Sequence, residues 1–219
     1  MKKILYTLLL VISGSAMSYA QNYSGLEGNV LIFKRNDIKP ENVMGSQYLY
    51  DKFSNAFVND GTQYFKIRYN NFTGLMEYEK GPNDLLELTP ESNAKIVFAD
   101  GTTYLYKTYF INKKETSNGY LKVIASSGSV HYYSVDRVIY SPMVKAANNY
   151  ESDKPAEFKK EKTAYFIEVN DAIVPVSKVK DIQNLFPSKE KDIKEYLKNN
   201  KVSLDNPYQM KAFIEFLAK

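Results

Sequence analysis

The 219-residue chain contains no cysteine and no tryptophan, and it has a single histidine. Without cysteine there are no disulfides, so stability must come from a packed core. His131 alone cannot build a multi-histidine zinc site, and no cysteine is available to complete one. A Gly-x-Ser-x-Gly elbow is missing too, so a hydrogen-bonded strand histidine is a better interpretation than a Ser-His-Asp triad. Calcium loops, Walker loops and dinucleotide fingerprints are also absent. The sequence therefore predicts no metal and no cofactor.

The chain also lacks a large net charge of either sign. The formal net charge is +4, and without Lys2 and Lys3 the chain has 27 basic against 25 acidic residues, a charge of +2. Nucleic-acid partners usually require a concentrated basic surface, so we expect none. Beyond the first residues no apolar run is long enough to cross a bilayer, which predicts no transmembrane segment in the processed chain.

The N-terminus has the pattern of a secretory signal peptide. Lys2 and Lys3 precede the apolar run 4–12, and small residues lead to Ala20 before the polar Gln21. We expect residues 1–20 to be removed after Ala20 and the protein to be exported, to the periplasm or beyond the cell. No cysteine follows the cleavage site, which excludes a lipid-anchored form.

Aromatic residues are abundant, with 19 tyrosines and 12 phenylalanines, and they suit half-buried sheet surfaces. Apolar and polar residues alternate in 63–70 and again in 75–80 around a short polar corner. A hairpin pairing Ile67 with Tyr78 and Arg68 with Glu77 places charge pairs and aromatic pairs in one register. This register directs Ile67 towards the core and Lys66 and Arg68 towards solvent.

Short strands separated by turn residues predict a mainly β fold, an antiparallel sandwich or barrel-like meander, with a short C-terminal helical segment. Residues 21–145 form the predicted antiparallel β domain, and residues 146–219 form a β-hairpin and helices packed on it. The polar stretch 145–162 marks the boundary. The expected strands are 29–34, 47–50, 55–58, 63–70, 75–80, 85–88, 95–98, 102–110, 120–125, 130–135, 164–169 and 172–176, with Asn118-Gly119 as a turn.

A helical period follows Ser177. Ser177 and Ser188 are the expected N-caps of two short helices, and Asn206 with Pro207 begins a third. Both serines belong to Ser-x-x-Lys matches, but helix capping explains them better than nucleophilic catalysis does. The third helix carries an apolar stripe, and we expect the stripe to pack on the fold: Met210, Phe213, Ile214 and Leu217.

Several of these features together resemble a family of uncharacterised exported β-rich proteins of Bacteroidetes-type bacteria. The resemblance is carried by the signal peptide that ends before Gln21, by Gly45-Ser46-Gln47-Tyr48-Leu49, by Ile67-Arg68-Tyr69-Asn70 and by the tail 178–199. It covers most of the processed chain. It implies a β-rich exported protein with a short helical C-terminus, and it implies no functional residue.

Tyrosines on strands expected to be neighbours are the candidate ligand- or partner-binding residues, because tyrosine can stack on sugars or anchor an interface. They are Tyr104, Tyr106, Tyr109, Tyr132 and Tyr133. Paired carboxylates can hydrolyse glycosidic bonds, but Glu77 and Glu79 have the ordinary spacing of a charged strand face. Asp84 and Glu87 follow them closely.

These observations favour an exported, non-enzymatic binding or protein-interaction module of the bacterial envelope. Its partner is an unidentified envelope protein or glycan. Two alternatives stay open: a small-molecule carrier with the sheet closed around a cavity, and a carboxylate-dependent glycan hydrolase.

Overall fold

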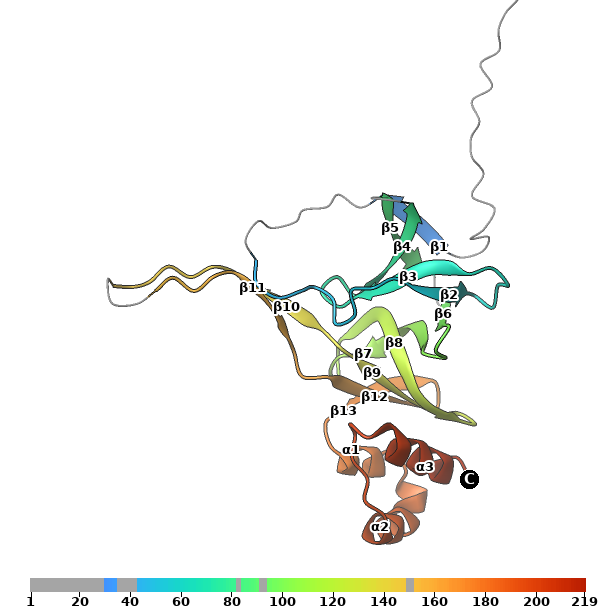
Figure 1. Ribbon diagram of the computed structural model, residues 1–219. Coiled ribbons are helices and arrows are strands. Elements are labelled where there is room, and N and C mark those ends of the chain that lie inside the picture. Colours follow the sequence, from blue (N-terminus) through green and yellow to red (C-terminus); the bar gives the residue numbers. More distant parts are fainter. Residues whose placement is uncertain (1–29, 35–42, 82–83, 91–93, 149–151) are drawn as a thin grey trace, which may run out of the picture.

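The computed structural model describes residues 30–34, 43–81, 84–90, 94–148 and 152–219. The predicted signal peptide and its cleavage site lie outside the described residues. An open antiparallel sheet of 11 strands dominates the fold, with the order β1-β5-β4-β3-β2-β6-β7-β8-β9-β12-β13 (Figure 1). A separate two-stranded ribbon pairs β10 with β11. The prediction of a mainly antiparallel β fold with a C-terminal helical segment is confirmed.

The strands of the large sheet are β1 (Val30–Lys34), β2 (Ser54–Val58), β3 (Phe65–Asn70), β4 (Leu75–Gly81), β5 (Asp84–Pro90), β6 (Lys95–Phe98), β7 (Thr103–Phe110), β8 (Thr116–Ser127), β9 (Val130–Val135), β12 (Ala164–Val169) and β13 (Ala172–Val176). The ribbon contains β10 (Val138–Ser141) and β11 (Glu157–Lys160). Two hairpin turns use left-handed residues, which Asn and Asp adopt more readily than bulkier side chains do. These residues are Asn59, Asp60, Asn170 and Asp171.

The predicted register of the β3–β4 hairpin is confirmed, because Ile67 pairs with Tyr78 and Arg68 pairs with Glu77. Other local predictions were wrong. Residues 47–50 are not a strand, and residues 118–119 lie inside β8 instead of forming a turn. The strands β10 and β11 were not predicted, because their sequences are short and the intervening residues are polar.

Side-chain alternation divides the core into three clusters. One lies between β2–β6 and β8 and includes Ile67, Met76 and Tyr120. A second cluster lies on the face of β7, β8, β9, β12 and β13 that is turned away from the helices. It includes Tyr133 and Phe166. The third lies on the opposite face of β8, β9 and β12 beneath the helices.

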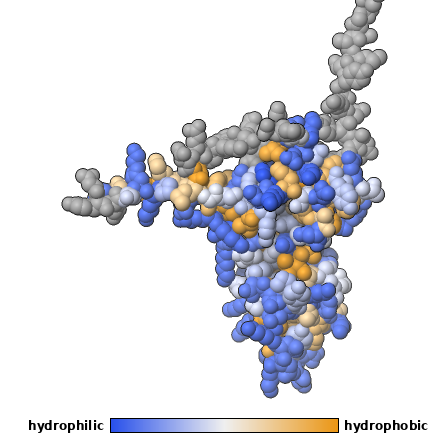
Figure 2. Space-filling view, in the orientation of Figure 1, coloured by the Kyte–Doolittle hydropathy of each residue, from blue (hydrophilic) through white to orange (hydrophobic). Residues whose placement is uncertain are grey.

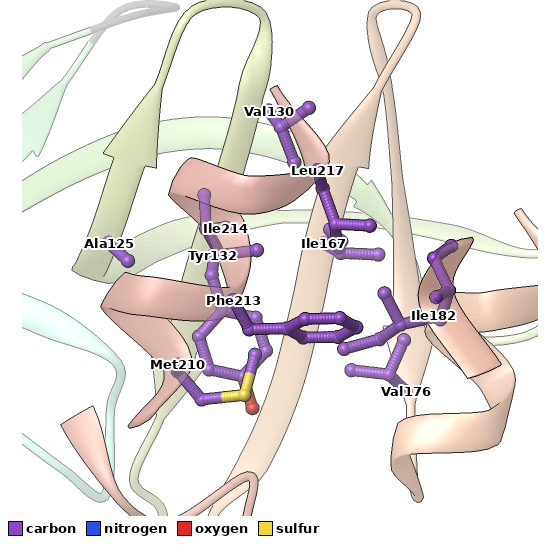
Figure 3. Close-up of a cluster of buried hydrophobic side chains, with 11 residues drawn as sticks. Ala125, Val130, Tyr132, Ile167, Val176, Ile182, Met210, Phe213, Ile214 and Leu217 are labelled. Carbon is purple, nitrogen blue, oxygen red and sulfur yellow. The ribbon is translucent and has the colours of Figure 1, made fainter. Parts of the chain in front are cut away.

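The helical segment covers the outer face of β8, β9 and β12 (Figure 1). It comprises α1 (Val179–Asn184), a 3₁₀ turn (Pro187–Lys189), α2 (Glu190–Asn199) and α3 (Pro207–Leu217). Figure 3 shows Met210 and Phe213 of α3 directed towards Tyr132, Ile167 and Ile182. Asn206 caps α3 as predicted and accepts from the Gln209 amide. The predicted caps Ser177 and Ser188 were wrong, because α1 and α2 begin one residue after Lys178 and Lys189.

A long arm leaves the body between β10 and β11 (Figure 1). Within it Val144 pairs with Lys154, and hydrophobic residues are interspersed along its surface (Figure 2). Gly45 has φ +78°, and its backbone packs closely against β11 at the base of the arm. A Cβ at this position would lie 2.6 Å from the Phe158 carbonyl oxygen, so only glycine fits. The predicted boundary at residue 145 falls within the arm. The strands on its two sides share one sheet, because β12 pairs with β9.

Candidate ligand-binding site

The five candidate tyrosines occupy three different environments. Tyr104 lines one cleft, whereas Tyr106 and Tyr109 line a second, smaller one. Tyr132 stacks on Tyr165 beneath the helices, and its hydroxyl donates to the Leu204 carbonyl at 3.1 Å. Tyr133 is buried inside the curled sheet, where its hydroxyl donates to Glu168. The fold therefore places Tyr104 and Tyr106 along the clefts and the two tyrosines of β9 in the core. Tyr109 lines the smaller cleft but is only 2% exposed and belongs to the same core cluster as Tyr133.

The larger cleft has a volume of about 560 Å³. We name it the tyrosine cleft. The segment 49–54 and β3 form one side, and the β6–β7 corner with β8 forms the other. The ends of β9 and β11 complete it. Its lining residues are Leu49, Tyr50, Lys52, Ser54, Arg68, Tyr69, Asn71, Phe98, Asp100, Thr102, Tyr104, Lys122, Asp136 and Lys160.

Aromatic rings form an apolar surface within the tyrosine cleft. The ring centroids of Tyr69 and Tyr104 are 5.2 Å apart at an interplanar angle of 32°, and Phe98 meets Tyr104 edge-on at 5.9 Å. Burial raises the pKa of Tyr69 to about 12, and burial also raises the pKa of Tyr104. Both phenols are therefore neutral at physiological pH and keep a proton to donate.

Charged groups stand beside these rings. The Thr102 amide donates to Asp100 at 2.8 Å, and this bond holds the pKa of the Asp100 carboxyl below its usual range. Asp136 accepts from the Thr163 hydroxyl at 2.6 Å and lies 3.8 Å from Lys160. Within the described part of the chain, Lys122 forms no ion pair. Carboxylate acceptors and an ammonium donor are thus both available to a ligand.

A buried polar network fixes segment 46–53, part of which forms one side of the tyrosine cleft. The Arg68 guanidinium lies between the rings of Tyr48 and Phe53, 3.8 and 4.3 Å from their centroids. Its Nε donates to Glu77 at 2.7 Å, and its Nη1 donates to the Asp51 carbonyl at 2.9 Å. Such planar, charge-assisted contacts fix both position and orientation.

This network corrects the prediction that the charged face of the β3–β4 hairpin points to solvent. Glu77 and Asn70 are fully buried, and Asn70 donates to Glu77 at 2.7 Å. Only Lys66, farther from the turn, is exposed as predicted. The reason is tertiary, because segment 46–53 covers a face that the hairpin alone would leave in water.

Asn71 joins segment 49–54 to the end of β9 in the wall of the tyrosine cleft. Its Oδ1 accepts from the Leu49 amide at 2.9 Å, and its Nδ2 donates to the Asp136 carbonyl at 3.0 Å. Asn71 is only 5% exposed, and its two hydrogen bonds fix the positions of these two segments relative to each other. Sequence reasoning missed Asn71 and Tyr69 as site residues. The only available signal was a polar turn after an aromatic strand, which is common in hairpins.

The lone histidine does not belong to a catalytic triad. His131 Nδ1 lies 2.6 Å from the Ser126 hydroxyl on the exposed end of the β8–β9 hairpin. Glu168 is its cross-strand neighbour, but that carboxylate bonds instead to Lys107 and Tyr133. The interpretation of His131 as a hydrogen-bonded strand residue is confirmed.

The described ranges contain no group of three or more His, Asp or Glu side chains placed to hold a metal ion. Within the same ranges, no helix is both long and apolar enough to cross a membrane. Comparisons of the chain with protein-family models, curated proteins and solved structures found no match.

Proposed function

We propose that the protein is an exported, non-enzymatic binding module that holds an oligosaccharide of the bacterial envelope in the tyrosine cleft. The observation that carries this proposal is the ring pair of Tyr69 and Tyr104, flanked by Asp100, Asp136 and Lys122. Ligand sites combine an apolar, often aromatic surface with a few placed polar groups that fix orientation.

A sugar ring matches this combination. Its C–H face is apolar and packs against an aromatic ring, whose face carries partial negative charge. Its hydroxyls both donate and accept hydrogen bonds. The side-chain oxygens of Asp100 and Asp136 accept from hydroxyls, whereas Lys122 and the neutral phenols donate to them. Because Arg68 and Asn71 already hold the walls, little ordering is required when the ligand enters.

The other two function classes have less support. A carrier that encloses its ligand needs a closed sheet, and this sheet is open with β1 and β13 at its edges. A glycan hydrolase needs a carboxylic acid with a raised pKa to protonate the leaving group. The pKa of Asp100 in the cleft moves in the opposite direction, and Glu77 is enclosed by its hydrogen-bond donors.

The test is calorimetric titration of the processed protein, which begins at Gln21, with neutral and uronic-acid-containing tetrasaccharides. We expect Tyr104→Ala to weaken binding about fivefold or more, because the stacking of a flat ligand ring on one aromatic side chain is worth about 1–3 kcal/mol in nucleic-acid complexes. Tyr64→Ala is the matched control, since Tyr64 is 56% exposed and does not line the cleft.

Binding that Tyr104→Ala weakens and Tyr64→Ala leaves unchanged supports the proposal. The proposal fails if no tetrasaccharide binds. It also fails if the Tyr104 and Tyr64 variants bind as tightly as the parent protein.

A further inference from the structure

A second, smaller cleft adjoins the tyrosine cleft, and the two share Tyr69 and Asn71. Its volume is about 220 Å³, which corresponds to the liquid volume of roughly seven water molecules. The β3–β4 turn lines one side, and β7 with β8 lines another. Arg137, just before β10, also lines it. Tyr69 and Asn71 therefore form a wall that is common to both clefts.

Arg137 provides an available positive charge at the smaller cleft. Its side chain is exposed, and one guanidinium nitrogen donates to the Tyr109 hydroxyl at 2.9 Å. Among the residues that the structure describes, no carboxylate forms an ion pair with it. The Oδ1 of the neighbouring Asp136 accepts from Thr163 and lies 3.8 Å from the Lys160 ammonium. Most of the five guanidinium donors therefore remain for an incoming anion.

Tyr120 provides an independent observation. This residue lines the smaller cleft and is only 2% exposed, between the rings of Tyr69 and Tyr106. Its hydroxyl has no hydrogen-bond partner among the described residues. A buried donor without a partner lowers the stability of a fold, so its retention calls for an explanation. An oxygen atom of a bound ligand would supply the missing acceptor once the ring shifts to bring its buried hydroxyl to the cleft surface.

We propose that the smaller cleft binds the carboxylate-bearing unit of an acidic oligosaccharide whose next sugar occupies the tyrosine cleft. This inference rests on the proposed function and names its ligand class. Arg137 pairs with the carboxylate through the planar fork that suits this group. Tyr109 positions the guanidinium, and Tyr120 donates its hydroxyl proton to a ligand oxygen. Tyr69 contacts both sugar units, because it belongs to both clefts.

The experiment compares two tetrasaccharides that differ only in one terminal unit, glucuronic acid or glucose. For the processed protein we expect the acidic form to bind about tenfold more tightly, as a charge-assisted pair implies. Arg137→Gln should reduce the affinity for the acidic form to that which the same variant has for the neutral form, so that the preference is lost. Lys180→Gln removes the same charge from an exposed position on α1 and should preserve the preference.

Tyr120→Phe separates a ligand contact from a purely structural defect. Removing the unpartnered hydroxyl should raise the melting temperature of the free protein and weaken the acidic tetrasaccharide several-fold. A higher melting temperature with unchanged affinity would overturn the role of Tyr120.

The remaining outcomes distinguish the two proposals. Equal binding of both tetrasaccharides, or a preference that survives Arg137→Gln, overturns the acidic ligand while the proposed function stands. If the preference depends on Arg137 but Tyr104→Ala has no effect, the tyrosine cleft is the wrong site for the next sugar. No binding of either tetrasaccharide overturns both proposals.

Discussion

At the scale of single residues, two buried carboxylates, Glu77 and Glu168, are each paired with a cation. Lys107 on β7 reaches both carboxylate oxygens of Glu168 on β12, at 2.8 and 2.9 Å. Burial disfavours the charged form of Glu168, but the bonds from Lys107 and Tyr133 outweigh burial and hold its pKa below 4.5. A depressed pKa means that the folded state favours the ionised carboxylate.

The pKa of Glu168 predicts a pH dependence of stability. Because its folded pKa is lower than its unfolded pKa, the contribution is complete above 4.5 and is lost as the pH falls through the folded value. Urea titrations should therefore show Glu168→Gln less stable than the parent protein at neutral pH, with the difference shrinking in acid. The exposed Glu195→Gln serves as the control. A difference that stays constant across this range would contradict the assignment.

The β3–β4 hairpin predicts a contrast between adjacent residues. Ile67 is fully buried, whereas Lys66 points to solvent. Ile67→Asp should lower the free energy of unfolding by more than ~3 kcal/mol, because a carboxylate replaces a packed side chain. Lys66→Ala should change it by about 0.5 kcal/mol or less. Equal losses in a denaturant titration would show that the faces are assigned wrongly.

At the scale of elements, the three helices depend on the sheet for their stability. Each is too short to persist alone in water, and their apolar faces meet in one cluster with β8, β9 and β12 (Figure 3). The four residues of the stripe predicted on α3 are all buried. The helix is therefore part of the fold and leaves no apolar stripe for a partner.

The packing of α3 is tested by two aromatic substitutions on that helix. Phe213 is fully buried, and Phe213→Ala should lower the free energy of unfolding by about 3–5 kcal/mol through lost contacts and a cavity. Tyr208 is 87% exposed, so Tyr208→Ala should have an effect of about 0.5 kcal/mol or less. The measurement is the melting temperature of each variant. If the two variants melt at the same temperature, α3 does not pack as described.

At the scale of the whole molecule, one sheet links the first and last strands of the chain. The site residues come from positions far apart in the sequence, such as Leu49, Asp100 and Lys160. Their meeting depends on β2 lying between β3 and β6. No single hairpin contains the tyrosine cleft.

Processing is the prediction that concerns the chain as a whole. Cells that export the protein should yield a form that begins at Gln21, because the segment 1–20 has the charge, apolar core and small-residue end of a signal peptide. Intact-mass measurement of the envelope and extracellular fractions checks this. Recovery of the chain with Met1 intact in those fractions would contradict export by signal cleavage.

The sequence by itself determined most of the local structure. Alternating side chains defined the β3–β4 hairpin and its register, and the Asn206-Pro207 pair defined the start of α3. These features depend on side-chain period and on backbone preferences, which act over a few residues. Pro175 lies in β13 at the edge of the sheet, where a residue without a backbone N–H is tolerated.

Only the tertiary structure decided where the clefts lie and which polar residues are buried. Glu77 and Arg68 form an ordinary cross-strand pair in the sequence, yet segment 46–53 covers them and turns them into a wall of the tyrosine cleft. Tyr104 and Tyr132 are both strand tyrosines, but one lines a cleft and the other packs under a helix. Burial depends on which distant segments meet, and side-chain alternation assigns a residue to a face without specifying what covers that face.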